Sequence, residues 1–266
     1  MISINRLGNL GRLANQMFQY ASLKGIARNK GYQFIIPPRE VFGMEDRNVK
    51  NSDVILYDVF KKVEDSNNNA LQEANIFWER SHSFDEDLFN NCPDNVDLVG
   101  YFQTEKYFKH IEDEIREDFT FNDELLQSCK TFIAENFKSE IISLHIRRGD
   151  YVVNPNHPTQ PLSYYEEGLS KLPDLPVLVF SDDPSWCRDQ ELFNGDRFMI
   201  SEDNTSDADL CLMSLCNYHI IANSSFSWWG AWLAKSKQVI APKNWFGGEC
   251  AQKSTDDVPF GNFEFL

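Results

Sequence analysis

The densest group of reactive side chains lies at the end of a short, mostly apolar run at residues 141–146 and just after it: His145, Arg147, Arg148 and Asp150. Such a run, closed by glycine or aspartate, is typical of a buried parallel strand, and open α/β sheets bind ligands beyond the carboxyl ends of such strands. Alternation along the strand puts His145 and Arg147 on one face and Arg148 on the other. Burying two adjacent arginines at a strand end costs free energy unless an anion binds to them. A diphosphate is a suitable anion, because the two N–H groups of a guanidinium can donate to two phosphate oxygens. The alternative is that both arginines pair with structural carboxylates.

A second group of polar side chains stands at an expected strand-to-helix junction. Ser224 and Ser225 are helix N-caps by default, yet hydroxyls and free helix N–H groups at such a junction also bind anions. The tryptophans that follow have helical spacing, so we expect Trp228, Trp229 and Trp232 in the core.

Two pairs of aspartates precede expected helices. Asp207 and Asp209 have the D-x-D spacing that holds a metal in one large class of enzymes, where the motif ends a strand. Here the pair precedes the apolar run 210–216, which favours a helix, and the helix dipole favours acids in the first turn. We therefore expect no metal role. Asp182 and Asp183 likewise predict a helix start, although they also follow a strand near the expected anion site.

Composition narrows the functional classes. With 266 residues, 42% of them apolar, the chain can hold one large or two modest folded domains. A net charge of −16 argues against nucleic acid or an anionic membrane as the main partner. Peripheral membrane contact and the oligomeric state stay open. The six cysteines lack zinc spacing, and neither a signal peptide nor a membrane-spanning run is evident, so we expect a cytoplasmic protein.

Hydrophobic periodicity predicts an α/β fold. The N-terminal half shows a strand, a glycine-rich turn and a helix; this layout also cradles phosphates, but the spacing favours a plain tight turn. The C-terminal half alternates strands and helices, which predicts a doubly wound parallel sheet. Expected strands are 2–7, 32–36, 96–102, 141–147, 176–181, 197–201, 219–223 and 238–241. Expected helices are 17–30, 106–119, 123–137, 163–172, 184–193, 207–217 and 226–235.

The chain resembles the α-1,2-fucosyltransferases of glycosyltransferase family 11. One departure is visible at residues 11–16, where the usual G-R-L-G-N-Q reads G-R-L-A-N-Q. Ala14 removes backbone freedom that glycine would provide. The stretches that carry the resemblance follow the family order: 15–21, 100–108, 145–151, 180–183 and 221–232.

The resemblance implies a GT-B-like fold of two Rossmann-like domains facing across a donor/acceptor cleft. Residues 1–138 are expected on the acceptor side, and residues 139–266 are expected to bind GDP-fucose. The implied reaction moves L-fucose from GDP-β-L-fucose to the 2-hydroxyl of a terminal galactose-type acceptor, with inversion and without a metal or other cofactor. Alternatives are another GDP-sugar transferase, an α-1,6 linkage, or a non-catalytic glycan-binding module, which would leave the arginines unexplained.

The same resemblance suggests residue roles. Arg147 would meet the charge that develops on the departing GDP, Arg148 would hold the nucleotide or brace the site, and Asp150 would orient both. The general base stays open between Asp150, Glu105, acids within 39–80, and late proton loss without a dedicated base. His145 would shape the guanosine pocket and Asp209 would read the guanine. Ser224, Ser225 and Phe226 would cap the phosphates, and Asn9, Arg12 and Gln16 would face the cleft from the N-terminal domain.

Overall fold

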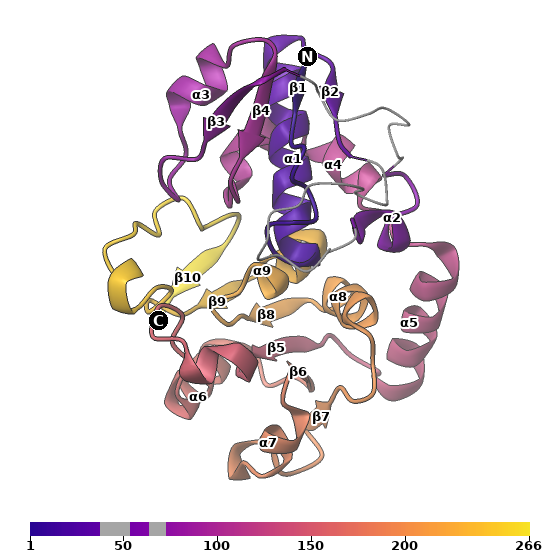
Figure 1. The fold of residues 1–266 in the computed structure, drawn as a ribbon. Helices are drawn as coiled ribbons and strands as arrows, with labels where there is room; N and C mark the ends of the chain where they lie inside the picture. The colour runs from indigo at the N-terminus through magenta and orange to yellow at the C-terminus, as the bar shows by residue number, and fades with distance from the viewer. Residues whose placement is uncertain (38–53, 64–72) are drawn as a thin grey trace. The chain divides into compact units, whose positions relative to one another are not determined.

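A computed structural model describes residues 1–37, 54–63 and 73–266 (Figure 1). The chain forms two compact units, each with its own parallel sheet. The first unit comprises Met1–Asn122 with Ser254–Val258, and the second comprises Asp123–Lys253 with Pro259–Leu266. The two parallel sheets confirm the α/β prediction.

The first unit contains a four-stranded parallel sheet with the order β2-β1-β4-β3. Strand β3 was not expected from the sequence, because it is an edge strand that leaves Ile76 and Trp78 exposed. The expected helix 106–119 is instead two 3-10 turns followed by a short α-helix. The strands are β1 (Ile2–Ser3), β2 (Phe34–Ile35), β3 (Asn75–Trp78) and β4 (Val96–Val99). The helices are α1 (Leu13–Lys30), α2 (Leu56–Val59), α3 (Glu86–Asn91), η1 (Glu105–Tyr107), η2 (Lys109–Ile111) and α4 (Glu112–Asp118).

Helix α1 organises the first unit, and it ends as predicted at Gly31, whose left-handed φ of 66° closes the last turn. Ala14 lies in the first turn of α1 and is buried, so the position does not need the freedom of glycine. The left-handed conformation falls on Gly8 and Gly11 instead, with φ of 93° and 84°. A Cβ atom at Gly11 would lie 2.1 Å from Asn15 Nδ2, so only glycine fits there.

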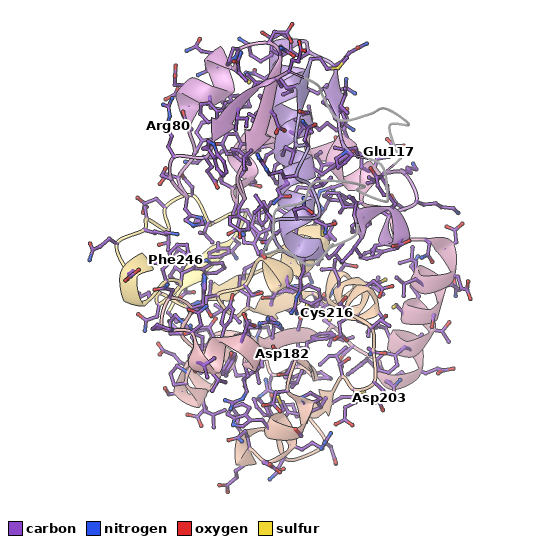
Figure 2. The ribbon with its side chains drawn as sticks, viewed as in Figure 1. Arg80, Glu117, Asp182, Asp203, Cys216 and Phe246 are labelled. Atoms are coloured by element: carbon purple, nitrogen blue, oxygen red, sulfur yellow. The ribbon has the colours of Figure 1, made fainter. Side chains whose placement is uncertain are left out.

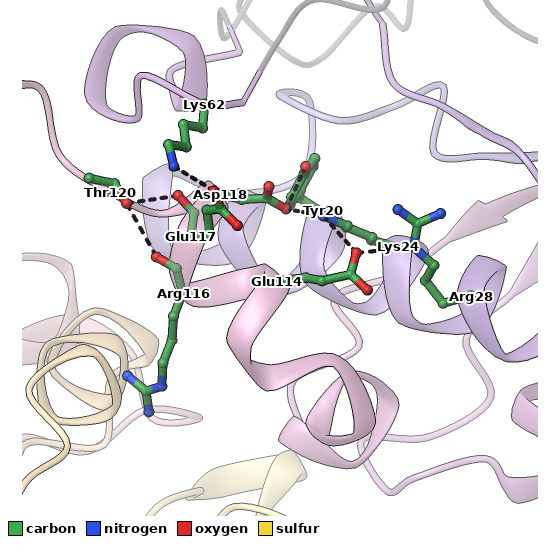
Figure 3. Close-up of polar contacts among 9 residues, drawn as sticks. All are labelled: Tyr20, Lys24, Arg28, Lys62, Glu114, Arg116, Glu117, Asp118 and Thr120. Carbon is green, nitrogen blue, oxygen red and sulfur yellow. Dashed lines mark hydrogen bonds and ion pairs between the residues drawn. The ribbon is translucent and has the colours of Figure 1, made fainter.

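A buried lysine fastens α1 to α4 (Figure 3). Lys24 is 7% exposed, and its Nζ lies 2.6 Å from Asp118 Oδ2 and 3.4 Å from Glu114 Oε2. The Tyr20 hydroxyl donates to the same Asp118 oxygen at 2.9 Å. Burial, reinforced by the Asp118 carboxylate, raises the pKa of Tyr20, so the phenol keeps the proton that it donates.

We expect Lys24→Ala to lower the free energy of unfolding by about 3 kcal/mol, because removing one partner of a buried pair leaves a charge uncompensated. Urea denaturation measures the loss. The matched control is Lys62→Ala, since Lys62 pairs with Glu117 at 2.6 Å while both side chains are at least half exposed. Water screens that pair, so its loss should change little. Equal losses in the two variants would contradict the role given to burial.

The second unit contains a six-stranded parallel sheet with the order β10-β9-β8-β5-β6-β7. Its expected strands and helices are present, although several are shorter. Strand β10, which pairs with β9, lies in a tail that the sequence pattern left unassigned. The strands are β5 (Ile142–Ile146), β6 (Val177–Ser181), β7 (Phe198–Ile200), β8 (Tyr218–Ile220), β9 (Val239–Ala241) and β10 (Phe263–Phe265). The helices are α5 (Asp123–Asn136), α6 (Leu162–Lys171), α7 (Pro184–Arg188), α8 (Ser206–Ser214) and α9 (Ser225–Leu233), with 3-10 turns at Gly149–Val153, Glu191–Phe193 and Gly248–Cys250.

The compact units do not divide where the sequence placed the domain boundary. Helix α5 was expected to close an N-terminal domain ending at residue 138, but it packs against α8 and groups with the second unit. The division therefore falls between residues 122 and 123. Residues 254–258, expected in the C-terminal domain, group with the first unit.

The apolar core of the second unit contains the aromatic side chains of α9. Trp228, Trp229 and Trp232 are buried, which confirms their predicted core role. Cys211 and Cys216 are also buried, as expected, and all six cysteines are free thiols. Within the described residues, no helix is both long and apolar enough to cross a membrane.

Candidate functional site

Both arginines follow the carboxyl end of β5, and both already have carboxylate partners. Arg147 Nη1 lies 2.9 Å from Asp182 Oδ2, and its Nη2 donates to Asp150. Arg148 Nε donates to Asp183 Oδ2 at 3.1 Å. This is the carboxylate pairing that the sequence left open as the alternative to an anion site. The group holds two cations and three carboxylates, so an incoming anion has to exchange with one of them.

Asp182, which is labelled in Figure 2, fixes the loop that carries the arginines. Besides its ion pair with Arg147, its Oδ1 accepts a hydrogen bond from the Arg148 backbone N–H at 2.8 Å. A Cβ atom at Gly149 would lie 2.3 Å from Asp182 Oδ2, so glycine lets the loop approach the carboxylate. The sequence assigned Asp182 to a helix start that follows a strand near the expected anion site, but its role in holding Arg147 was missed.

The neighbouring Asp183 caps helix α7, as expected. Its Oδ1 accepts a hydrogen bond from the Trp186 backbone N–H at 3.1 Å, and this bond is the main reason that the pKa of Asp183 is lowered. The Arg148 guanidinium lies 4.1 Å from the centre of the Trp186 ring. Arg148 is therefore held on two sides, by a carboxylate and by an aromatic face.

Tyr151 links the arginine loop to the loop before α9, and sequence reasoning missed it. Its ring centre lies 5.2 Å from the Arg147 guanidinium, and its hydroxyl donates to the Asn223 carbonyl at 3.2 Å. Burial raises the pKa of Tyr151 to about 12, so the hydroxyl keeps its proton. The available signal was its place at the end of the motif H-I-R-R-G-D-Y.

His145 is brought together with the start of α9. Its Nδ1 lies 2.9 Å from Ser227 Oγ, and its ring centre lies 5.8 Å from that of Phe226. Burial lowers the pKa of His145 to about 3, so the imidazole is neutral near pH 7. Ser224 is the N-cap of α9, with its Oγ accepting from the Phe226 backbone N–H at 3.3 Å, and Ser225 begins the helix.

Asp209 lies in the first turn of α8, where the sequence predicted it. Its Oδ1 accepts a hydrogen bond from Ser201 Oγ at 2.7 Å, and burial raises its pKa. Its hydrogen bonds go to Ser201 and Asn204, so they do not join it to the arginine group, although α8 packs against α9. The part of the chain that the structure describes holds no cluster of three or more His, Cys, Asp or Glu arranged for a metal.

The expected residues of the first unit differ in their surroundings. Arg12 is exposed as the N-cap of α1, and Asn9 is half-buried. Gln16, in contrast, is fully buried, and its Oε1 accepts from the Ile55 backbone N–H at 2.9 Å. Gln16 therefore braces the segment at Ile55, and its expected position facing a cleft stays a prediction.

The alternative general bases also have partners. Glu105 is buried and accepts from Lys109 Nζ at 2.7 Å. Glu79 accepts from the backbone N–H groups of Tyr101 and Phe102, both at 2.8 Å. The acids at 38–53 and 64–72 lie outside the described residues.

Residues 2–258 match the family model described as Glycosyl transferase family 11. The chain belongs to glycosyl transferase family 11. This membership confirms the resemblance drawn from the five motif stretches.

Three curated relatives of this family 11 chain differ in identity and coverage. The O-antigen biosynthesis glycosyltransferase WbnK of Escherichia coli is 37% identical, over 71% of this chain and 66% of that protein. An alpha-1,2-colitosyltransferase of Escherichia coli is 32% identical, over 90% of this chain and 91% of that protein. The galactoside alpha-(1,2)-fucosyltransferase 2 of Bos taurus is 26% identical, over 86% of this chain and 69% of that protein.

Solved structures share the fold of the family 11 chain. A crystal structure of POFUT1 in complex with GDP aligns with a TM-score of 0.55 and 11% identity, covering 88% of this chain and 94% of that one. A crystal structure of NodZ alpha-1,6-fucosyltransferase soaked with GDP-fucose aligns with a TM-score of 0.53 and 14% identity, covering 93% of this chain and 96% of that one. The likeness confirms the GT-B-like fold class.

Proposed function

We propose that this glycosyltransferase moves L-fucose from GDP-β-L-fucose to the 2-hydroxyl of a terminal galactose-type acceptor, forming an α-1,2 linkage. The observation that carries the proposal is the Arg147 guanidinium, fixed at the carboxyl end of β5 in a chain of family 11. Two relatives support the linkage: the colitosyltransferase at 32% identity and the galactoside fucosyltransferase at 26% are both named for α-1,2 transfer.

The pairing of Arg147 suggests how the donor enters. The Asp150 side chain is 61% exposed, so water screens its ion pair with Arg147 and the pair is cheaply exchanged. Asp182 is less exposed and also holds the Arg148 backbone, so it keeps the guanidinium in place. A diphosphate oxygen of GDP-fucose would take the position of Asp150 on Nη2. Arg147 would then face the bond that breaks, while its Nη1 stays paired with Asp182.

In the proposed reaction, the acceptor 2-hydroxyl oxygen attacks C1 of fucose as the bond from C1 to the β-phosphate oxygen breaks. The bonding electrons leave with GDP, and Arg147 stabilises the negative charge that grows on the diphosphate. The acceptor proton needs a destination, and Asp150 becomes available once phosphate has displaced it from Arg147. We therefore propose Asp150 as the general base, with Arg147 as the second catalytic residue.

The other expected donor residues enter this proposal in supporting roles. Arg148 stacks on Trp186 and pairs with Asp183, which supports bracing of the loop. Neutral His145 would line the guanosine pocket, and Asp209 would accept the guanine N–H groups. We propose that Ser224, Ser225 and Phe226 cap the phosphates at the start of α9, and that Asn9 and Arg12 act on the acceptor side.

A second donor is favoured by one observation. The colitosyltransferase is more similar to this chain, at 32% identity over 91% of its length, than the galactoside fucosyltransferase. Colitose is fucose without the 3-hydroxyl group, so both sugars present the same leaving group to Arg147. Competition between GDP-fucose and GDP-colitose for one acceptor would rank the two donors.

We also propose that transfer needs no metal and takes place in the cytoplasm. The D-x-D pair supports the first point, because it lies in a helix and Asp209 is held by Ser201. The buried thiols of Cys92, Cys129 and Cys187 support a reducing compartment.

The test is incubation of the protein with GDP-fucose and lactose in excess EDTA, followed by linkage analysis of the product. We expect 2′-fucosylated lactose at the rate seen without EDTA. Loss of activity in EDTA and its recovery with Mg²⁺ or Mn²⁺ would return Asp207 and Asp209 to the list of metal ligands. A 6-linked product would contradict the α-1,2 proposal. A protein that binds lactose but releases no GDP would instead be a glycan-binding module.

A further inference from the structure

One tryptophan of the first unit is left on the surface. All six tryptophans lie within the described residues, and Trp78 is 62% exposed while the others are buried or half-buried. It ends strand β3, at the carboxyl edge of the parallel sheet, where ligands of open α/β folds bind. Ile76, two residues earlier on the same strand face, is 51% exposed. The edge strand therefore presents a small apolar face that ends in an indole ring.

The Trp78 ring contacts Arg6, which follows strand β1 and pairs with Asp97 on β4. The Arg6 guanidinium lies 5.4 Å from the ring centre, and Arg6 Nη1 lies 3.9 Å from Asp97 Oδ2. Asp97 on β4 is buried, and its Oδ1 accepts from the Asn5 backbone N–H at 2.7 Å and from Ser3 Oγ at 3.1 Å. A buried carboxylate thus positions the arginine, and the arginine backs one face of the indole.

We propose that Trp78 is an acceptor subsite on which the apolar face of the terminal galactose ring stacks. The inference rests on the proposed function, which requires the protein to bind a galactoside. Galactose carries its C–H groups at C3, C4 and C5 on one side, and this side suits a flat, rigid aromatic surface. An indole already oriented by Arg6 loses little freedom when the sugar binds, which favours affinity.

The size and surroundings of the face favour a sugar over a protein partner. Stable protein interfaces bury about 800 Å² on each partner. Here the exposed apolar residues of β3 are Ile76 and Trp78, and they are followed by the exposed cation Arg80 (Figure 2). A charged residue at an edge strand discourages pairing with a second copy. One pyranose ring covers about the area of one indole.

The test compares Trp78→Ala, Trp78→Phe and the control Ile76→Ala, which removes apolar area from the same strand face. We expect Trp78→Ala to raise the KM for lactose at least 10-fold with a smaller change in kcat, and Trp78→Phe to stay within about 3-fold of the parent. GDP affinity and slow hydrolysis of GDP-fucose should be unchanged in all three. Saturation-transfer NMR of lactose, which needs no turnover, should show the sugar signal lost in Trp78→Ala alone.

Several outcomes would overturn the subsite. One is an unchanged lactose KM and NMR signal in Trp78→Ala. Another is an equal loss in Ile76→Ala together with a concentration-dependent dimer in sedimentation, which would mark the face as a contact between copies. A parent protein that binds no galactoside would also overturn it. Failure of the proposed function is distinct from these outcomes, because it would appear as lactose binding at Trp78 without any transfer from GDP-fucose.

Discussion

The Arg147→Lys variant should lose roughly 10²- to 10³-fold in kcat, the loss typical when a charge-stabilising donor is removed from an active site. Lysine keeps the positive charge, but it cannot donate to Asp182 and to a phosphate oxygen from the two nitrogens of one planar group. The free energy of unfolding should change little, because a lysine can keep one of the ion pairs. Single-turnover transfer from GDP-fucose measures the effect, and urea denaturation checks the fold.

Arg188→Lys is the matched control for this variant. Arg188 forms an ion pair with Glu202, and both side chains are well exposed. The same change of residue type there should leave turnover at the parent level. If Arg147→Lys also retained near-normal turnover, Arg147 would be a structural residue paired with aspartates, and the catalytic proposal would fall.

The second large effect is expected at Asp209. Asparagine at this position can still accept the Ser201 hydrogen bond, so the start of α8 should be preserved. It replaces one carboxylate oxygen with an N–H donor, which would face an N–H group of guanine. We expect Asp209→Asn to weaken GDP binding about 10- to 100-fold, or about 1.4 to 2.7 kcal/mol. Calorimetric titration with GDP and with ADP would show both the loss and a reduced preference for guanine.

Asp207→Asn controls for the loss of a carboxylate from the same helical turn. Asp207 shares the favourable dipole position of Asp209, so its substitution tests the general effect of charge at this helix end. We expect GDP affinity to be nearly unchanged. An Asp209→Asn variant that binds GDP as tightly as the parent would refute the guanine assignment.

The sequence pattern correctly predicted the helices and strands whose side chains are buried along most of their length. Strand β5 and helix α9 were expected because their apolar runs are long and bounded by turn residues. Strand β3 is an exposed edge and has no buried run to reveal it. The predicted helix 106–119 is interrupted because its start packs tightly on α1: a Cβ atom at Gly25 would lie 2.0 Å from the Tyr107 carbonyl oxygen. That contact comes from tertiary packing, which helical periodicity does not contain.

The arginine group was located from residue types, but its partners were not. Identifying Asp182 as the anchor requires knowing that β5 and β6 are neighbours, with Ile146 opposite Ser181. Periodicity predicts both strands without giving their order in the sheet. The same limit applies to Gln16, because the sequence cannot show that the segment at Ile55 folds over it. The residue types thus suggested which side chains would act on a phosphate. The order of the strands in the sheet determines which residues hold those side chains in place.

The path of the chain through residues 254–258 has a consequence for dissecting the protein. This segment groups with the first unit, and Asp257 accepts hydrogen bonds there from Lys106 Nζ and, at 2.6 Å, from the Phe84 backbone N–H. The next residues return to the second unit, where β10 pairs with β9. No single cut therefore yields two intact halves. A fragment ending at residue 253 would leave β9 as a sheet edge without its β10 partner and prone to association, so the two units should be studied by substitution rather than by truncation.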